Sequence, residues 1–205
     1  RDHGRAPPNA GHRGRAVPPR EHPHRARPRH AEELSWVNCA MAEYSLSQAS
    51  DLAQLSLDGL GKKLDDEGVR ARNCLYLAHL SIELALKAAL EQAGMAGKDI
   101  RRMSHNLHAL STAVGRCSFE YALGQGRATA IRDITVTNAE GCLSFGYFVE
   151  ATQWKFFSSY PTELRYGPNV THFDPEAVAQ LAAELCKWLQ VRVQTFRLIA
   201  ASLSL

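Results

Sequence analysis

The sequence predicts an all-α protein, a helical bundle with a long C-terminal helix, preceded by a disordered tail rich in Arg, Pro and His. Three observations support this fold class. Residues 70–94 are apolar on almost every side, which indicates a central helix surrounded by other helices. Residues 42–61 carry an amphipathic helical stripe. Asp174-Pro175 combines an N-cap with proline at the first helical position, and the helical pattern after it continues to about residue 201.

The central segment also carries the polar residues that matter most. A membrane-spanning helix needs about 20 nearly uninterrupted apolar residues. Because polar residues interrupt the apolar run of the central segment, we expect a soluble bundle and no membrane span. Glu83 and Lys87 lie four residues apart with the acidic residue first, the favourable order for a pair on one helix face. Gly94 is a typical helix end. Between Cys74 and Leu90, the run is interrupted only by His79, Ser81, Glu83 and Lys87.

Short connections join these helices. Residues 62–68 form a charged connection, and residues 95–104 form a polar loop. The GMAGKD stretch in that loop lacks the spacing of a P-loop and the hydroxyl after its lysine. Ser104 is predicted to cap a short helix that ends at Gly115. The apolar side chains of that helix are Leu107, Leu110 and Val114.

Residues 116–153 allow two interpretations. IRDITV (131–136) and CLSFGYFV (142–149) are β-branched and aromatic, and TNAEG separates them, so they can form a hairpin. The second segment also fits a helix, and we favour a helix from about residue 143. GQGRAT resembles a dinucleotide-binding loop only weakly.

The N-terminal tail distorts the overall charge of +3. Residues 1–30 hold eight arginines and two acidic residues, so the remaining chain has a net charge of −3. A segment with six of the nine prolines and no Leu, Ile or Phe cannot bury a core, and we expect residues 1–40 to be disordered. They are either a basic arm for nucleic acid or, as we favour, the result of a misplaced start or of cloning, since Met41 is the first methionine. The folded domain is then 41–205.

Several classes of protein do not fit the composition. Five cysteines at wide spacings and no CxxC indicate neither a disulfide framework nor a zinc site. Cys74 and Cys186 fall in apolar helical patterns and are interpreted as small core residues. No secretion signal opens the chain, so the expected location is the cytoplasm. No motif calls for a cofactor or a metal.

Three blocks in order resemble the HEPN domain, the all-α domain named for higher eukaryotes and prokaryotes nucleotide-binding. They are SIELALKAALEQAG, SHNLHAL and ELRYG before a long C-terminal helix. The resemblance covers about residues 42–205, with 118–150 as a divergent or inserted connection. It implies an up-and-down helical bundle that is commonly a homodimer. Many members are toxin or defence ribonucleases that need no metal, and others are inactive partners of a nucleotidyltransferase or act as scaffolds.

Active members of that family carry an Arg and a His separated by four to six residues, and the matching pair here is Arg165 and His172. The guanidinium can stabilise a phosphate, and the imidazole can exchange a proton with a hydroxyl. Two departures weaken the match. Tyr166 replaces the usual polar residue, and Gly167-Pro168 breaks the backbone within the pair. The alternative is a structural ion pair for Arg165 and a surface position for His172.

Other candidates for nucleotide or phosphate contact lie beside the central helix. Arg101, Arg102 and His105 form the basic cluster RRMSH, which is otherwise a solvated loop. Glu83 and Lys87 either line a nucleotide pocket or form a buried structural pair. His79 is interpreted as a core histidine. Any activity is expected where residues 101–108 and 165–172 meet.

Two functions from different classes follow from the resemblance. The favoured one is an accessory HEPN module that binds a nucleotide, RNA or a protein partner, with a nucleotidyltransferase or an antitoxin as candidate partners. The alternative is a toxin-type endoribonuclease that uses Arg165 and His172. The break at Gly167-Pro168 and the presence of Tyr166 are the reasons for preferring the first.

Overall fold

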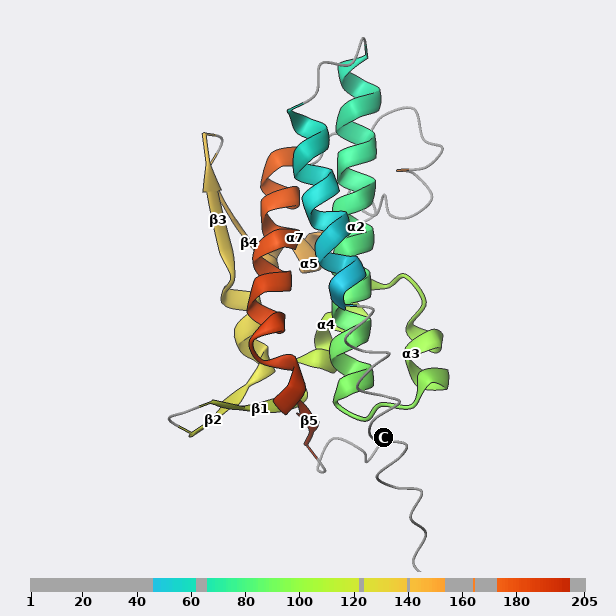
Figure 1. Ribbon diagram of the computed structural model, residues 1–205, viewed down its shortest axis with the longest axis vertical. Coiled ribbons are helices and arrows are strands. Elements are labelled where there is room, and N and C mark those ends of the chain that lie inside the picture. The colour runs from blue at the N-terminus through green and yellow to red at the C-terminus, as the bar shows by residue number, and fades with distance from the viewer. Residues whose placement is uncertain are drawn as a thin grey trace, which may run out of the picture.

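The computed structural model describes residues 46–61, 66–121, 124–139, 141–153, 164 and 173–199. Over these residues the chain is mostly helical, with a small antiparallel sheet at one end of the helices and a separate hairpin along their side (Figure 1). The predicted tail, residues 1–40, lies outside the described residues, so its predicted disorder stays a prediction.

The elements follow the chain in a simple order. A helix at 46–60 comes first. The other helices are α2 (Glu67–Gln92), α3 (Gly97–Met103), α4 (Leu107–Val114), α5 (Phe145–Ala151) and α7 (Pro175–Gln190), with short 3-10 helices η1 (Ala128–Asp133) and η2 (Val193–Thr195). The strands are β1 (Cys117–Tyr121), β2 (Gly124–Arg127), β3 (Thr135–Asn138), β4 (Gly141–Ser144) and β5 (Arg197–Leu198).

The predicted central helix is confirmed as α2. Asp66 begins it, because its side chain accepts a hydrogen bond from the backbone N–H of Val69. Gly94 ends it with a φ of +90°, where glycine carries no Cβ penalty. The backbone N–H of Met95 then reaches the carbonyl of Leu90 at 2.9 Å, which closes a Schellman motif. No helix in the described parts of the chain is long and apolar enough to cross a membrane.

The helix at 46–60 lies antiparallel to α2, and α7 packs along α2 as well (Figure 1). Two buried serines join the first pair. Ser81 of α2 donates to the carbonyl of Ala49 at 2.6 Å, and Ser56 donates to the carbonyl of Cys74 at 2.8 Å. Each hydroxyl can reach the backbone of the opposite helix because the side chains at this contact are small, which lets the two helices lie close together. A Cβ on Gly59 would lie 3.0 Å from the sulfur of Cys74.

The ambiguous region contains both structures that the sequence suggested. Strands β3 and β4 form an antiparallel hairpin, in which Val136 pairs with Leu143. Helix α5 begins directly after it, at Phe145, and Ser144 caps it by accepting from the backbone N–H of Tyr147. The hairpin packs against α7. The hairpin interpretation is therefore confirmed for 135–144, and the predicted start of the helix at about 143 is confirmed to within two residues.

Three expectations need correction. The chain is not purely α-helical, because β2, β1 and β5 form a three-stranded sheet that periodicity did not indicate. The last helix ends at Gln190 rather than near 201, because the chain then turns and β5 pairs with β1. The cap of the short helix α4 is Asn106, whose side chain accepts from the backbone N–H of Ala109, and not Ser104. The predicted start of the last helix, at Asp174-Pro175, is confirmed.

An aromatic cluster anchors the sheet to the end of α7. The ring of Phe119 in β1 packs edge-on to Trp188 and stacks on Phe196. The guanidinium carbon of Arg192 lies 4.5 Å from the centre of the Trp188 ring. Gly126, opposite Phe119 in β2, has no room for a side chain, since a Cβ there would lie 2.5 Å from the ring. The last turn of α7 and the sheet therefore form one packed unit.

His79 is a core histidine, as predicted. Its ring is 3% exposed, its Nδ1 donates to the carbonyl of Leu75 at 2.8 Å, and its edge meets Phe148. Burial lowers the pKa of His79 to about 4. The imidazole is therefore neutral in the folded chain at neutral pH. In the unfolded chain, His79 binds a proton once the pH falls below the ordinary histidine pKa of 6.5.

This difference predicts acid sensitivity. As the pH falls from 7 to 5, His79 becomes protonated in the unfolded state but stays neutral in the folded state. The free energy of unfolding therefore falls by about 2 kcal/mol. Urea unfolding at both pH values should show that loss in the wild type and a smaller one in His79→Leu. An equal loss in the two proteins would mean that other groups cause the acid sensitivity.

Candidate functional site

A buried carboxylate lies at the centre of the candidate site. The side chain of Glu83, in the middle of α2, is only 3% exposed. Its Oε1 accepts from the Nζ of Lys87 at 2.6 Å, one helical turn later. Both of its oxygens face the Nδ1 of His105, at 2.9 and 3.1 Å. Because a buried carboxylate is costly unless it is paired and hydrogen-bonded, these contacts hold three predicted residues together.

A strained turn brings His105 to α2. Ser104 has φ +50° and ψ −120°, values of the first central position of a type II′ turn, which glycine normally occupies. The turn is closed by a hydrogen bond of 3.0 Å from the backbone N–H of Asn106 to the carbonyl of Met103. Asn106 then caps α4. A non-glycine residue in this region costs of order 1–3 kcal/mol and persists only where the surroundings enforce it.

The geometry sets what the cluster can do. With Nδ1–H of His105 directed at Glu83, the ring is held in one orientation and its Nε2 is on the opposite side. The ring of His105 is 48% exposed, and the side chain of Lys87 is 23% exposed. Glu83 thus positions an ammonium and an imidazole side by side at the surface. Such a pair can hydrogen-bond a phosphate oxygen, and the imidazole can also move a proton.

The other predicted contacts do not join this cluster. Both arginines of α3 turn back along their own helix. Arg102 pairs with Asp99 at 3.3 Å, and the guanidinium of Arg101 lies 3.3 Å from the Cβ position of Gly97. Arg165 and His172 lie outside the described residues, as do Tyr166, Gly167 and Pro168. The predicted meeting of 101–108 with 165–172 therefore stays a prediction.

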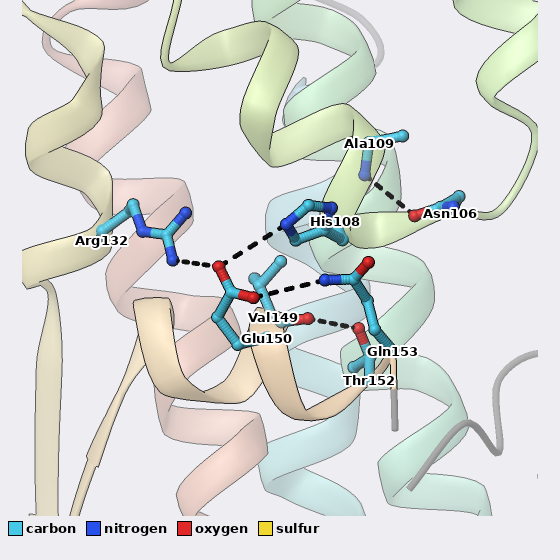
Figure 2. Close-up of polar contacts among 8 residues, drawn as sticks. All are labelled: Asn106, His108, Ala109, Arg132, Val149, Glu150, Thr152 and Gln153. Carbon is cyan, nitrogen blue, oxygen red and sulfur yellow. Dashed lines mark hydrogen bonds and ion pairs between the residues drawn. The ribbon is translucent and has the colours of Figure 1, made fainter. Parts of the chain in front are cut away.

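A second ionic cluster lies nearby, and the sequence analysis did not single it out. Figure 2 shows Glu150 of α5 between Arg132 of η1 and His108 of α4. One carboxylate oxygen lies 2.5 Å from a guanidinium nitrogen of Arg132 and 3.5 Å from the Nε2 of His108. The hydrogen bond from Arg132 is the main cause that lowers the pKa of Glu150. This cluster ties α5 to η1 and α4.

The sequence could have drawn attention to His108 but not to its partners. His108 follows His105 by three residues: His105 lies in the turn before α4, and His108 lies in the first turn of α4. Their partners, Glu83 and Glu150, come from distant parts of the chain. No local pattern links those partners, so only the packing of α4 between α2 and α5 shows that each histidine meets a carboxylate.

The described residues form no metal site, and their cysteines are not paired. No group of three or more His, Cys, Asp or Glu side chains there could hold a metal ion. Cys74, Cys117, Cys142 and Cys186 are free thiols, and burial raises the pKa of Cys117 and of Cys186 to about 11. Comparison of the chain with protein-family models, curated proteins and solved structures finds no match.

The strain at Ser104 predicts a substitution that stabilises the protein. Ser104→Gly removes the clash at φ +50°, so the free energy of unfolding should rise by about 1 kcal/mol despite the greater freedom of glycine in the unfolded chain. Urea denaturation measures the change. Ser104→Val, with a β-branched side chain, should destabilise. A loss of stability in Ser104→Gly would show that the turn is not strained.

The buried ion pair predicts a non-additive pair of substitutions. Glu83→Leu alone leaves the ammonium of Lys87 without its acceptor and should cost about 3 kcal/mol. Adding Lys87→Met removes the stranded charge and should restore most of that loss. Urea unfolding of both variants tests this. The matched control is Lys187→Met, which breaks an exposed pair with Glu184 and should change stability by less than about 1 kcal/mol. Equal losses in the single and double variants would contradict the pairing.

Proposed function

We propose that this chain is a HEPN-type accessory module that binds the phosphate groups of a nucleotide or RNA at the cluster of Lys87, Glu83 and His105. The observation that supports this is the buried carboxylate of Glu83, which hydrogen-bonds both the ammonium of Lys87 and the imidazole of His105. An ion pair between Glu83 and Lys87 that served only to stabilise α2 would not need a third residue held in place by a strained turn. Here the turn at Ser104 delivers His105 to the same carboxylate.

The resemblance to HEPN domains gains support from the same geometry. Its first two blocks, SIELALKAALEQAG and SHNLHAL, are far enough apart in the chain that no helical spacing joins them. In space, Glu83 of the first block meets His105 of the second. The proposal extends to a homodimer and to a partner such as a nucleotidyltransferase or antitoxin, which the family resemblance implies.

Binding of ATP and of a 20-nucleotide RNA to the full chain, measured by calorimetry, tests the proposal. His105→Gln and Lys87→Gln each remove one charge-assisted contact of about 1.5 kcal/mol, so each should weaken ATP binding about ten-fold. Lys187→Gln, which removes an exposed lysine on α7, should leave the affinity unchanged. Circular dichroism should show that all variants remain folded.

Two results would reject this function. One is a wild-type chain that binds neither ATP nor the RNA. The other is binding that His105→Gln and Lys87→Gln leave at wild-type strength, which would place the phosphate site elsewhere.

A further inference from the structure

We infer that the outer face of the β2-β1-β5 sheet is a second binding surface, which contacts the phosphate backbone of single-stranded nucleic acid. The register of the strands carries this inference. Ser118 of β1 pairs with Arg127 of β2 on one side and with Arg197 of β5 on the other. Residues paired across neighbouring strands leave the sheet on the same face. A serine hydroxyl therefore lies between two arginines in one row.

Burial shows which way this row faces. Cys117 and Phe119, the neighbours of Ser118 in β1, are buried against the helices. Side chains alternate along a strand, so the Ser118 row points to the opposite, solvent side. Arg127 and Arg197 are both exposed, as that orientation requires. With neighbouring strands about 4.8 Å apart, the two arginines start roughly 10 Å apart, wide enough to bracket a phosphate group.

Most cations at the sheet end of the molecule have no ion-pair partner among the described residues. Several cations of the described residues face a carboxylate, as Lys87, Arg102, Arg132 and Lys187 do. At the end that contains the sheet and α3 (Figure 1), cations without an ion-pair partner in the described parts of the chain collect. They are Lys98, Arg101, Arg116, Arg127, Arg192 and Arg197. Over all described residues, carboxylates slightly outnumber cations, so this is a local concentration.

The kind of side chain favours nucleic acid over an acidic protein. Five of these six cations are arginines, whose planar fork of donors matches phosphate oxygens better than an ammonium does. Arg197 keeps its guanidinium close to the sheet by donating from Nη1 to the carbonyls of Phe196 and Gln194, at 2.6 and 3.2 Å.

This surface is separate from the cluster around Glu83 and does not depend on it. The outer face of the sheet also carries an acidic residue, Glu120. It lies two residues from Ser118 on the same face and pairs across the strands with Gln125. A carboxylate there repels phosphate. Removing it should therefore strengthen binding, which a purely structural role of the sheet would not produce.

The test uses the full chain and a fluorescein-labelled 20-nucleotide oligo(dT), with fluorescence anisotropy at several salt concentrations. Arg127→Gln/Arg197→Gln should weaken binding about ten-fold and reduce the slope of log affinity against log salt by about 1.4, or about 0.7 for each lost phosphate contact. Glu120→Gln should tighten binding two- to three-fold. The basic tail is present in every variant, so its contribution cancels in each comparison.

The charge-matched control is Arg70→Gln/Lys187→Gln, which removes two cations that are each paired with a carboxylate of their own helix. It should have less than a two-fold effect. The inference is overturned if Arg127→Gln/Arg197→Gln binds oligo(dT) with wild-type affinity and salt slope. It is also overturned if the two arginines govern binding only to vesicles of phosphatidylserine or to a poly-glutamate peptide. His105→Gln separates the two proposals, because it should weaken ATP binding and leave oligo(dT) binding unchanged.

Discussion

The buried carboxylate of Glu83 is the constraint around which the candidate site is arranged. It lies in the middle of α2 and is almost fully buried, where an unpaired charge would cost several kcal/mol. One partner, Lys87, comes from the same helix and follows from its sequence spacing. The other, His105, reaches it only because the chain adopts a strained turn at Ser104. The charge on α2 thus accounts for the conformation of the connection that follows α3.

The same helix also determines how closely its neighbours approach. Two buried hydroxyls, those of Ser81 and Ser56, hydrogen-bond α2 to the helix at 46–60. Each satisfies its donor on a backbone carbonyl of the opposite helix, so neither is left as a buried unpaired donor. The helix at 46–60 packs closely on this side of α2, and α3, α4 and the turn between them pack on the side that carries Glu83. The fold therefore separates a tightly packed side of α2 from the side that carries the candidate site.

The strands add a surface that a simple bundle would lack. The aromatic cluster of Phe119, Trp188 and Phe196 fills the inner side of the sheet and joins it to α7. With that side fully packed, the alternation of β1 directs Ser118 and its arginine neighbours outward. The outward direction of Arg127 and Arg197 is thus a consequence of the aromatic packing behind the sheet. The two proposed surfaces differ accordingly. The cluster of Lys87, Glu83 and His105 is built on a buried carboxylate, whereas the outer face of the sheet is built on arginines that pair with no buried carboxylate among the described residues.

Much of the helical framework follows from the sequence alone. Apolar periodicity and caps located α2, its end at Gly94, and the start of α7 at Asp174-Pro175, because these signals are local and lie within one helix. The pair of Glu83 and Lys87 follows from the same spacing. Tertiary structure decided the rest. The end of α7 at Gln190, the pairing of β5 with β1, and the contact of His105 with Glu83 all join residues that are distant in the chain. Helical periodicity carries no information about such contacts, since their energy comes from partners that only the folded chain brings together.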